Sequence, residues 1–310
     1  MQAQTSMKLL ITDSLSKDAI LEIKKAGIEV DDCSSSPKEE IVFRLHGVDI
    51  IVVRSATKIT NSMIDKMDNA KLIIRAGVGL DNIDVDYAKS KGIEVKNIPR
   101  VSSTSVAELV FGHMLACARN IVNGTISIKE KKWEKHSLEG TELFGKTLGI
   151  IGFGTIGKKV AKIGKAFGMI VIAFNPNKKS KRVKMVDLDM LLKESDFITL
   201  HVPSLPSTKY LLGKKEFDKM KDGVVIVNCA RGGIIDESAL LGALKKGRVR
   251  AAALDVFERE PPNHSELFNL TNVVFTPHIG AETIEAQKRI GLEIVKIVRR
   301  FIGKLKTKRK

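Results

Sequence analysis

The sequence TLGIIGFGTIG, at residues 147–157, decides the fold of this chain. Its first part is a short apolar run that is typical of a buried strand. Gly152, Gly154 and Gly157 then complete the pattern G-x-G-x-x-G. An amphipathic helix is expected from about residue 156 to 167, and a second apolar strand over 170–174. A strand, a glycine turn, a helix and a second strand in this order form the context in which the pattern binds a dinucleotide.

Each of the three glycines has its own physical reason. Gly152 permits a tight turn, and Gly154 has no side chain that would keep a pyrophosphate away. Gly157 lets the helix pack close to the strand. The phosphates would then accept hydrogen bonds from the free N–H groups at the helix N-terminus, where the helix dipole favours negative charge.

Length and composition indicate two aliphatic domains. The chain has 310 residues, 43% of them hydrophobic and only 5% aromatic, as expected where buried parallel strands rich in Val and Ile dominate. No hydrophobic run is long enough to cross a bilayer, and no secretory signal is found. Cys33, Cys117 and Cys229 are far apart and show no C-x-x-C spacing. We therefore expect a cytoplasmic protein with neither disulfides nor a metal site.

The net charge of +16 permits acidic partners such as nucleic acid, a membrane surface or small acids. We interpret most of the lysines as a solvated surface. The basic tail at 304–310 lacks the interleaved aromatic residues of a single-strand binder, and residues 1–6 are expected to be a polar extension. The sequence therefore predicts a small-molecule substrate, with no nucleic-acid partner and no membrane partner.

Strands that alternate with helices predict a doubly wound parallel sheet in each domain. The expected strands of the first domain are 8–13, 28–32, 49–54, 72–75 and 93–97. Those of the second are 148–151, 170–174, 197–201, 224–229, 251–255 and 273–276.

The last helix, from 284 to about 301, carries an apolar stripe but no strand follows it. Its stripe contains Ile290, Ile294, Ile297, Val298 and Phe301. We expect it to return to the first domain, so that residues 7–100 plus 284–310 form a discontinuous domain around residues 101–283.

A linker is expected at 99–103, followed by a helix to about 119 that is apolar on nearly all sides and should be buried. Ser105 and Glu108 match a capping box at its start.

Arg231 follows the strand 224–229 and precedes two glycines. Ligands of open α/β sheets bind at the carboxyl ends of strands, and a guanidinium can hold a carboxylate through two parallel hydrogen bonds. A structural ion pair of Arg231 with Asp236 or Glu237 explains the spacing equally well.

His278 follows the strand 273–276. Three acids, Asp255, Glu258 and Glu260, lie at the end of the strand 251–255. A hydrogen-bonded loop histidine is the common alternative. Taken together, however, the three strand ends suit hydride transfer on a 2-hydroxy acid. His278 would take the hydroxyl proton, Glu260 would fix its tautomer, and Arg231 would anchor the substrate carboxylate.

Over nearly its whole length the chain resembles the D-isomer-specific 2-hydroxyacid dehydrogenases. The resemblance is strongest to the members that oxidise 3-phospho-D-glycerate, in a short form that lacks regulatory domains. The motifs that carry this resemblance are VRSATK at 53–58, RAGVGLDN at 75–82, the glycine pattern at 152–157, NCARGG at 228–233, DVF at 255–257, Glu260-Pro261 and PHIGA at 277–281.

The resemblance implies an α/β fold in which a Rossmann cofactor domain is inserted into a flavodoxin-like substrate domain. It implies Arg231, Glu260 and His278 as the catalytic residues. The residues expected to bind the cofactor are Val78, Gly152, Gly154, Thr155, Ile156, Gly157, Asn175, Val202, Cys229, Ala230, Arg231, Asp255, His278, Ile279, Gly280 and Ala281. Backbone groups of Gly77, Val78 and Gly79 would hold the substrate carboxylate beside Arg231.

A substrate phosphate would suit Arg54 and Arg75, which end neighbouring strands of the first domain. In the family, the segment at 132–135 lies at the contact of a homodimer, so Lys135 is a candidate for the partner's phosphate site. A solvated surface lysine is the alternative. Trp133 is interpreted as an interface anchor.

Two positions depart from the family pattern. Asn175 stands where an Asp usually binds the adenosine ribose and repels a 2′-phosphate. NAD is the cofactor we expect, and tolerance of NADP is a further hypothesis because four cations that could attract a 2′-phosphate follow: Lys178, Lys179, Lys181 and Arg182. Ser102 replaces a common Asn between the domains.

The leading functional hypothesis is NAD-linked oxidation of 3-phospho-D-glycerate to 3-phosphohydroxypyruvate, which opens L-serine synthesis. A glyoxylate or hydroxypyruvate reductase would use the same site residues. A non-catalytic, dinucleotide-sensing binding protein is the third hypothesis.

Overall fold

The chain forms two compact units in the computed structural model, which describes residues 7–176, 179–263 and 265–308. Unit 1 consists of Met1–Ser102 with Glu282–Lys310, and unit 2 of Ser103–Ala281. These boundaries lie two residues from the 100 and 283 expected from the sequence. The N-terminal extension, Lys178 and the last two residues of the basic tail lie outside the described residues.

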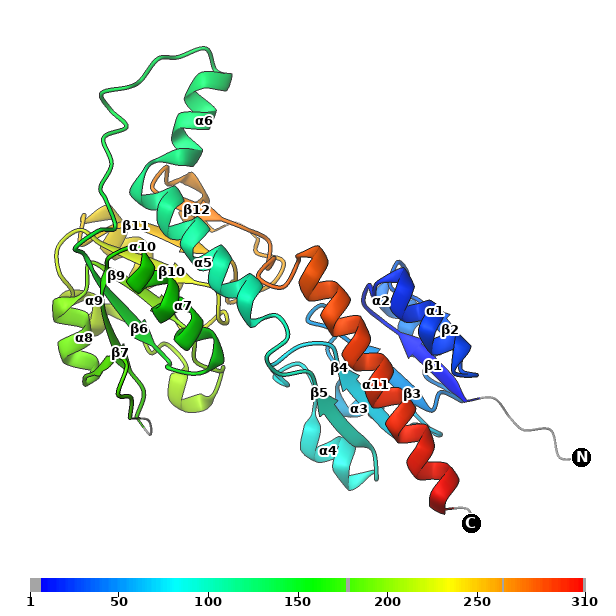
Figure 1. Cartoon of the computed structure of the whole chain (residues 1–310). Helices are drawn as coiled ribbons and strands as arrows, with labels where there is room; N and C mark the ends of the chain where they lie inside the picture. The colour runs from blue at the N-terminus through cyan, green and yellow to red at the C-terminus, as the bar shows by residue number, and fades with distance from the viewer. Residues whose placement is uncertain (1–6, 177–178, 264, 309–310) are drawn as a thin grey trace, which may run out of the picture. The chain divides into compact units, whose positions relative to one another are not determined.

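Unit 1 contains a five-stranded parallel sheet with the order β2-β1-β3-β4-β5 (Figure 1). This is the order of the flavodoxin-like doubly wound fold, as the family resemblance implies. The strands are β1 (Lys8–Ile11), β2 (Glu29–Asp32), β3 (Ile50–Val53), β4 (Leu72–Arg75) and β5 (Glu94–Asn97). The helices are α1 (Lys17–Lys25), α2 (Lys38–Phe43), α3 (Asn61–Ile64), α4 (Val85–Ser90) and α11 (Ile284–Lys308).

The strands of unit 1 are buried on both faces because alternate residues enter different cores. Leu9 and Ile11 of β1 pack in one core with α1 and α11. Leu10 packs in the other core, with residues of α2, α3 and α4. Ile290 and Ile294 of α11 are 1% and 0% exposed, which is the burial that the apolar stripe of this helix predicts.

Unit 2 contains a seven-stranded parallel sheet with the order β12-β11-β10-β9-β6-β7-β8. Read from β8 and numbered within the unit, the order is 3-2-1-4-5-6-7, the Rossmann order with one added strand. The strands are β6 (Thr147–Ile151), β7 (Ile170–Phe174), β8 (Lys184–Met185), β9 (Phe197–Leu200), β10 (Val224–Asn228), β11 (Val249–Leu254) and β12 (Val273–Phe275). The α-helices are α5 (Ser103–Ala118), α6 (Ile121–Lys129), α7 (Thr155–Ala166), α8 (Leu188–Glu194), α9 (Lys214–Lys219) and α10 (Glu237–Lys245).

Helix α5 begins two residues earlier than its proposed cap. Ser105 therefore lies inside the helix, and the capping-box prediction is wrong. The Ser105 hydroxyl donates instead to the carbonyl oxygen of Gly280 at 2.7 Å, a contact across 175 positions that local sequence reasoning cannot see. As expected from its composition, α5 is largely buried; within unit 2 its apolar residues share a core with β6 and α7.

Helix α6 stands away from the sheet of unit 2 and leaves several apolar side chains in contact with solvent (Figure 1). Within the described part of the chain, none of the helices combines the length and apolarity that a bilayer crossing requires.

Candidate active site

The glycine turn between β6 and α7 has the shape that a dinucleotide phosphate needs. Gly152 has a φ of 100°, and a Cβ there would approach the carbonyl oxygen of His201 to 2.5 Å. A Cβ at Gly157 would collide with the carbonyl oxygen of Gly152, so the helix packs directly on the turn. Gly154 is the N-cap residue of α7, and a Cβ there would meet open space. The turn therefore combines a tightly packed base with an open rim at a helix N-terminus, which fits a pyrophosphate.

The other candidate cofactor residues of this half lie at neighbouring strand ends. Thr155 and Ile156 form the first turn of α7, and Asn175 directly follows β7. Val202, after β9, packs beside the glycine turn. Lys179, Lys181 and Arg182 are exposed, which leaves their charge accessible.

Asn228 shapes the loop that carries Arg231. Its side chain is 2% exposed; Oδ1 accepts from the Ala230 N–H and Nδ2 donates to the Arg231 carbonyl, both at 3.0 Å. Asp236 caps α10 by accepting from the Ala239 N–H, and Glu237 accepts from the Glu258 N–H at 2.7 Å. The two acids that were alternative partners of Arg231 thus have backbone donors of their own.

His278 and Glu260 form a close pair. The distance from His278 Nδ1 to Glu260 Oε2 is 2.7 Å, and the side chains are 29% and 36% exposed. Burial opposes ionisation of Glu260, but the hydrogen bond and charge of His278 outweigh it, with help from the Phe257 N–H and the Arg231 guanidinium, so the pKa of Glu260 is lowered. Glu260 therefore interacts with both His278 and Arg231 within unit 2.

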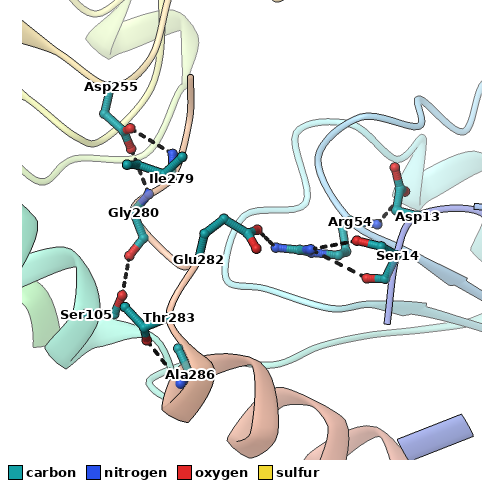
Figure 2. Close-up of polar contacts among 10 residues, drawn as sticks. All are labelled: Asp13, Ser14, Arg54, Ser105, Asp255, Ile279, Gly280, Glu282, Thr283 and Ala286. Atoms are coloured by element: carbon teal, nitrogen blue, oxygen red, sulfur yellow. Dashed lines mark hydrogen bonds and ion pairs between the residues drawn. The ribbon is translucent and has the colours of Figure 1, made fainter. Parts of the chain in front are cut away.

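Asp255 fixes the loop that presents His278. Asp255 is 1% exposed, and its carboxylate accepts a hydrogen bond from the Thr276 hydroxyl at 2.6 Å. The carboxylate also accepts from the N–H groups of Ile279 and Gly280 at 2.7 and 2.9 Å (Figure 2). His278 has a left-handed φ of 54°, and its own N–H donates to the Asp255 carbonyl at 2.8 Å. Both carboxylate oxygens of Asp255 and its carbonyl oxygen thus accept hydrogen bonds from the segment that begins at Thr276.

Sequence reasoning missed three members of this support, namely Thr276, His113 and Ser105. Thr276 Oγ1 lies 3.0 Å from Nε2 of His113, and burial lowers the pKa of His113 despite the charge of Asp255. The third is Ser105, which fastens Gly280 from α5. The position of Thr276 between a strand and His278 was a usable signal, whereas nothing local distinguished His113.

Burial also separates His278 from the histidine His201, which follows β9. His201 is enclosed, and this burial lowers its pKa to about 3. It therefore stays neutral near neutral pH and is unsuited to exchanging protons with a ligand. Among the residues the structure describes, no cluster of His, Cys, Asp or Glu could hold a metal ion.

Burial also keeps the Cys229 thiol protonated near neutral pH. Cys229 lies two residues before Arg231 and was expected to line the cofactor. Desolvation, together with the charge of Asp255, raises the pKa of its thiol well above the ordinary value. Only its backbone is then suited to a ligand. Ala281, the last of the candidate cofactor residues, is also the last residue of unit 2.

The glycine turn of unit 1 follows β4 and is built differently. Arg75 is 8% exposed, and its guanidinium occupies the space where a Cβ of Gly77 would stand. Val78 is 42% exposed, and its carbonyl accepts from Asn97 Nδ2 at 2.6 Å. Gly79 is half-buried. This turn therefore places a buried arginine against Gly77, next to the exposed residue Val78.

Arg54 follows the neighbouring strand β3. Its carbonyl oxygen accepts from Asn82 Nδ2 at 2.7 Å, which ties it to the glycine turn. Its N–H donates to Asp13 Oδ2 at 2.7 Å, and its guanidinium pairs with the Glu282 carboxylate (Figure 2). The structure thus gives Arg54 an acidic neighbour that was not anticipated.

Lys135 lies on an exposed stretch after α6, close to Trp133, which is 82% exposed. Four apolar side chains of α6 are also well exposed: Ile121, Val122, Ile126 and Ile128. This part of unit 2 therefore presents an apolar surface with a lysine beside it.

Comparison with known proteins finds relatives over most of the chain. Residues 111–280 match the family model described as D-isomer specific 2-hydroxyacid dehydrogenase, NAD binding domain. The chain is 53% identical over 299 residues to a hydroxypyruvate reductase of Thermotoga maritima, covering 94% of this chain and 97% of the relative. It is 49% identical over 302 residues to the D-3-phosphoglycerate dehydrogenase of Methanocaldococcus jannaschii, covering 96% of this chain but only 57% of that longer relative.

Among solved structures, the D-lactate dehydrogenase of Aquifex aeolicus, complexed with NAD and lactic acid, matches with a TM-score of 0.83 and 32% identity, covering 96% of this chain and 95% of that one. A family model that spans more than half of the chain, together with relatives of this similarity, identifies the family. The chain belongs to the D-isomer specific 2-hydroxyacid dehydrogenases.

Proposed function

We propose that the chain is an NAD-dependent dehydrogenase that interconverts a D-2-hydroxy acid and its 2-oxo acid by hydride transfer. The observation that carries this proposal is the 2.7 Å contact of His278 Nδ1 with Glu260, on whose ionisation Arg231 also acts. The oxidation of a hydroxy acid requires a base, a carboxylate that orients the base, and a cation that holds the carboxylate of the substrate.

The contact with Glu260 assigns the proton positions on His278. A carboxylate at Nδ1 keeps the proton on that nitrogen, so Nε2 is left as the base that accepts the hydroxyl proton. As the hydroxyl proton moves to Nε2, the C2 hydrogen leaves the substrate with its electron pair. NAD, when bound, supplies the acceptor for this hydride. Glu260 stabilises the imidazolium that results, and Arg231 holds the substrate carboxylate.

For the substrate, we propose 3-phospho-D-glycerate, with 3-phosphohydroxypyruvate as the product, which would make this reaction the opening step of L-serine synthesis. Arg54 and Arg75 are our candidates for the phosphate, because they follow the paired strands β3 and β4. Backbone groups of Gly77, Val78 and Gly79 are our candidate contacts for the carboxylate, and the exposed Lys135 is a candidate contact from a partner subunit. The likeness to a named D-3-phosphoglycerate dehydrogenase supports this choice.

Reduction of hydroxypyruvate or glyoxylate is the second candidate. The Glu282 carboxylate that contacts Arg54 favours it, because this negative charge opposes a phosphate. The likeness to a named hydroxypyruvate reductase, which this chain matches over nearly its full length, supports it as well.

A substrate panel tests these proposals. NADH absorbance is followed with 3-phospho-D-glycerate and D-glycerate in one direction, and with 3-phosphohydroxypyruvate, hydroxypyruvate and glyoxylate in the other. We expect turnover of the phosphorylated pair, and we expect Arg54→Ala to lower it selectively. Equal loss on unphosphorylated acids would remove the phosphate role of Arg54. No turnover at all, together with salt-dependent nucleic-acid binding, would favour a non-catalytic binder.

We also propose NAD as the preferred cofactor and the cytoplasm as the location. The three cysteines, all buried and free, suit a reducing compartment. Ratios of kcat/KM for NAD and NADP test the cofactor, and a strong NADP preference would overturn it.

A homodimer is our proposal for the assembly. The apolar side chains of α6 and Trp133 are costly to leave in water and would be covered by a second copy. Sedimentation of the wild type and of Trp133→Ala tests this: we expect a dimer that the substitution weakens, and a monomeric wild type would contradict the proposal.

A further inference from the structure

The guanidinium of Arg54 already has an anionic partner inside unit 1. Its Nη2 donates to Glu282 Oε1, and its Nη1 lies 3.4 Å from both the carbonyl and the hydroxyl oxygen of Ser14. Figure 2 shows the Arg54 side chain between these two residues. The side chain of Arg54 is 15% exposed. A substrate phosphate that reached Arg54 would thus meet a cation whose hydrogen-bond donors are partly in use.

Glu282 lies immediately before α11, yet it is not needed to cap that helix. The Thr283 hydroxyl accepts from the Ala286 N–H at 3.2 Å and satisfies the helix start (Figure 2). The Glu282 side chain is 42% exposed and turns to Arg54. Its carboxylate therefore forms an ion pair with Arg54, the arginine that the proposed function assigns to the phosphate.

A second carboxylate stands close to the same arginine. Asp13, 8% exposed, accepts the backbone N–H of Arg54 and the hydroxyl of Thr12. An N–H donor that would suit an anion is thus occupied as well. Two carboxylates, those of Asp13 and Glu282, thus contact Arg54 itself, whereas phosphate sites usually carry an excess of cations and free N–H donors.

The chemistry of arginine determines what Glu282 can do here. A guanidinium keeps its proton throughout the physiological pH range, so Glu282 cannot tune its ionisation. What Glu282 changes is the net charge that an incoming ligand meets. A phosphate monoester carries nearly two negative charges at neutral pH and is repelled by the carboxylate, whereas the uncharged hydroxymethyl group of glycerate is not.

We propose that Glu282 is a specificity-determining residue: an internal counter-ion of Arg54 that disfavours phosphorylated hydroxy acids relative to unphosphorylated ones. This inference rests on the proposed function, because it takes Arg54 as the contact for the substituent on C3 of the substrate. It explains how a chain with both arginines can resemble a reductase of an unphosphorylated acid.

The test is Glu282→Gln, which keeps the size and the hydrogen-bond acceptor and removes the charge. kcat/KM is measured for 3-phospho-D-glycerate and for D-glycerate. We expect the ratio of the two to rise about tenfold in favour of the phosphorylated acid, mainly through a lower KM, with D-glycerate changed less than about twofold. A ratio that is unchanged or falls would overturn the inference, since Glu282 would then be neutral or would position Arg54 for phosphate.

Two further variants isolate the cause. Glu285→Gln removes the same charge from an exposed position in the first turn of α11, and we expect the ratio to stay at the wild-type value. Glu282→Gln in an Arg54→Ala background should also leave the ratio unchanged relative to Arg54→Ala alone. A shift with Glu285→Gln, or a shift that persists without Arg54, would contradict the counter-ion role.

The outcomes separate this inference from the proposed function. If only Glu282→Gln oxidises the phosphorylated acid, the inference holds and the proposed substrate is wrong. If the wild type already prefers the phosphorylated acid and Glu282→Gln changes nothing, the proposed substrate holds and the inference is wrong. If neither acid is oxidised, calorimetric affinities of both acids for wild type and Glu282→Gln replace kcat/KM, and the same tenfold shift in their ratio is required.

Discussion

Glu260 in unit 2 and Glu282 in unit 1 are both partly exposed carboxylates that hold a basic side chain, yet they serve different chemistry. Glu260 contacts an imidazole, a side chain that can accept and release a proton, so its charge can assist a proton transfer. Glu282 contacts a guanidinium that never loses its proton, so its charge can only compete with another anion. The comparison teaches that the role of an acid depends on whether its partner titrates.

The strongest test of this comparison is His278→Gln. Glutamine retains polarity but cannot accept the hydroxyl proton, so we expect kcat to fall on the order of 10²–10⁴-fold with either acid. Steady-state kinetics measure the fall, and the thermal midpoint checks that the variant is folded. A loss below about tenfold would mean that His278 is not the base.

Glu260→Gln is expected to have a smaller effect, because the imidazole remains. We expect kcat to fall about 10–10²-fold, since the imidazolium that forms would lose its carboxylate partner. Steady-state kinetics measure the fall. Glu282→Gln is the matched control; an equal fall in kcat there would mean that the two carboxylates do not differ in kind.

The lowered pKa of Glu260 has a consequence for stability that can be measured in the wild type. Because its folded-state pKa lies below the unfolded value, the pair stabilises the fold above the unfolded pKa and the contribution is lost as the pH falls through the lowered one. Denaturant unfolding of wild type and Glu260→Gln should therefore differ near neutral pH and converge at the acid end. A difference that grows on acidification would contradict this sign.

A third position sharpens the comparison because it lacks a carboxylate. Asn175 follows β7, and exposed cations lie a few residues beyond it. Asn175→Asp adds a charge that repels a 2′-phosphate, so we expect the kcat/KM ratio of NAD to NADP to rise roughly tenfold. Kinetics with both cofactors give the ratio; no change would show that Asn175 does not meet the adenosine ribose.

The smallest effect is expected at the cysteines, where burial acts in place of a charged partner. Burial raises the pKa of Cys33 to about 11 and that of Cys117 to about 12, and it raises the pKa of Cys229 well above its ordinary value. We expect iodoacetamide to leave the native protein unlabelled and active near neutral pH, and to label it once denatured. Rapid native labelling of Cys229 with loss of activity would place a thiol beside the imidazole in the chemistry.

The sequence by itself determined what depends on local pattern. Apolar runs with glycine and helix signals specify the two parallel sheets, because strand period and turn chemistry are local properties. It also singled out Arg231, Glu260 and His278, because they follow strand ends, and in the structure Glu260 interacts with both of the others.

Only the tertiary structure decided which distant groups meet. The Ser105 hydroxyl donates to the Gly280 carbonyl, although the local pattern suggested a helix cap. His113 contacts Thr276, which donates to Asp255 next to the loop that carries His278. Glu282 meets Arg54 across 228 positions of the chain. The reason is physical: hydrogen bonds and ion pairs form between atoms within about 4 Å, and the fold, not the spacing along the chain, brings such atoms together.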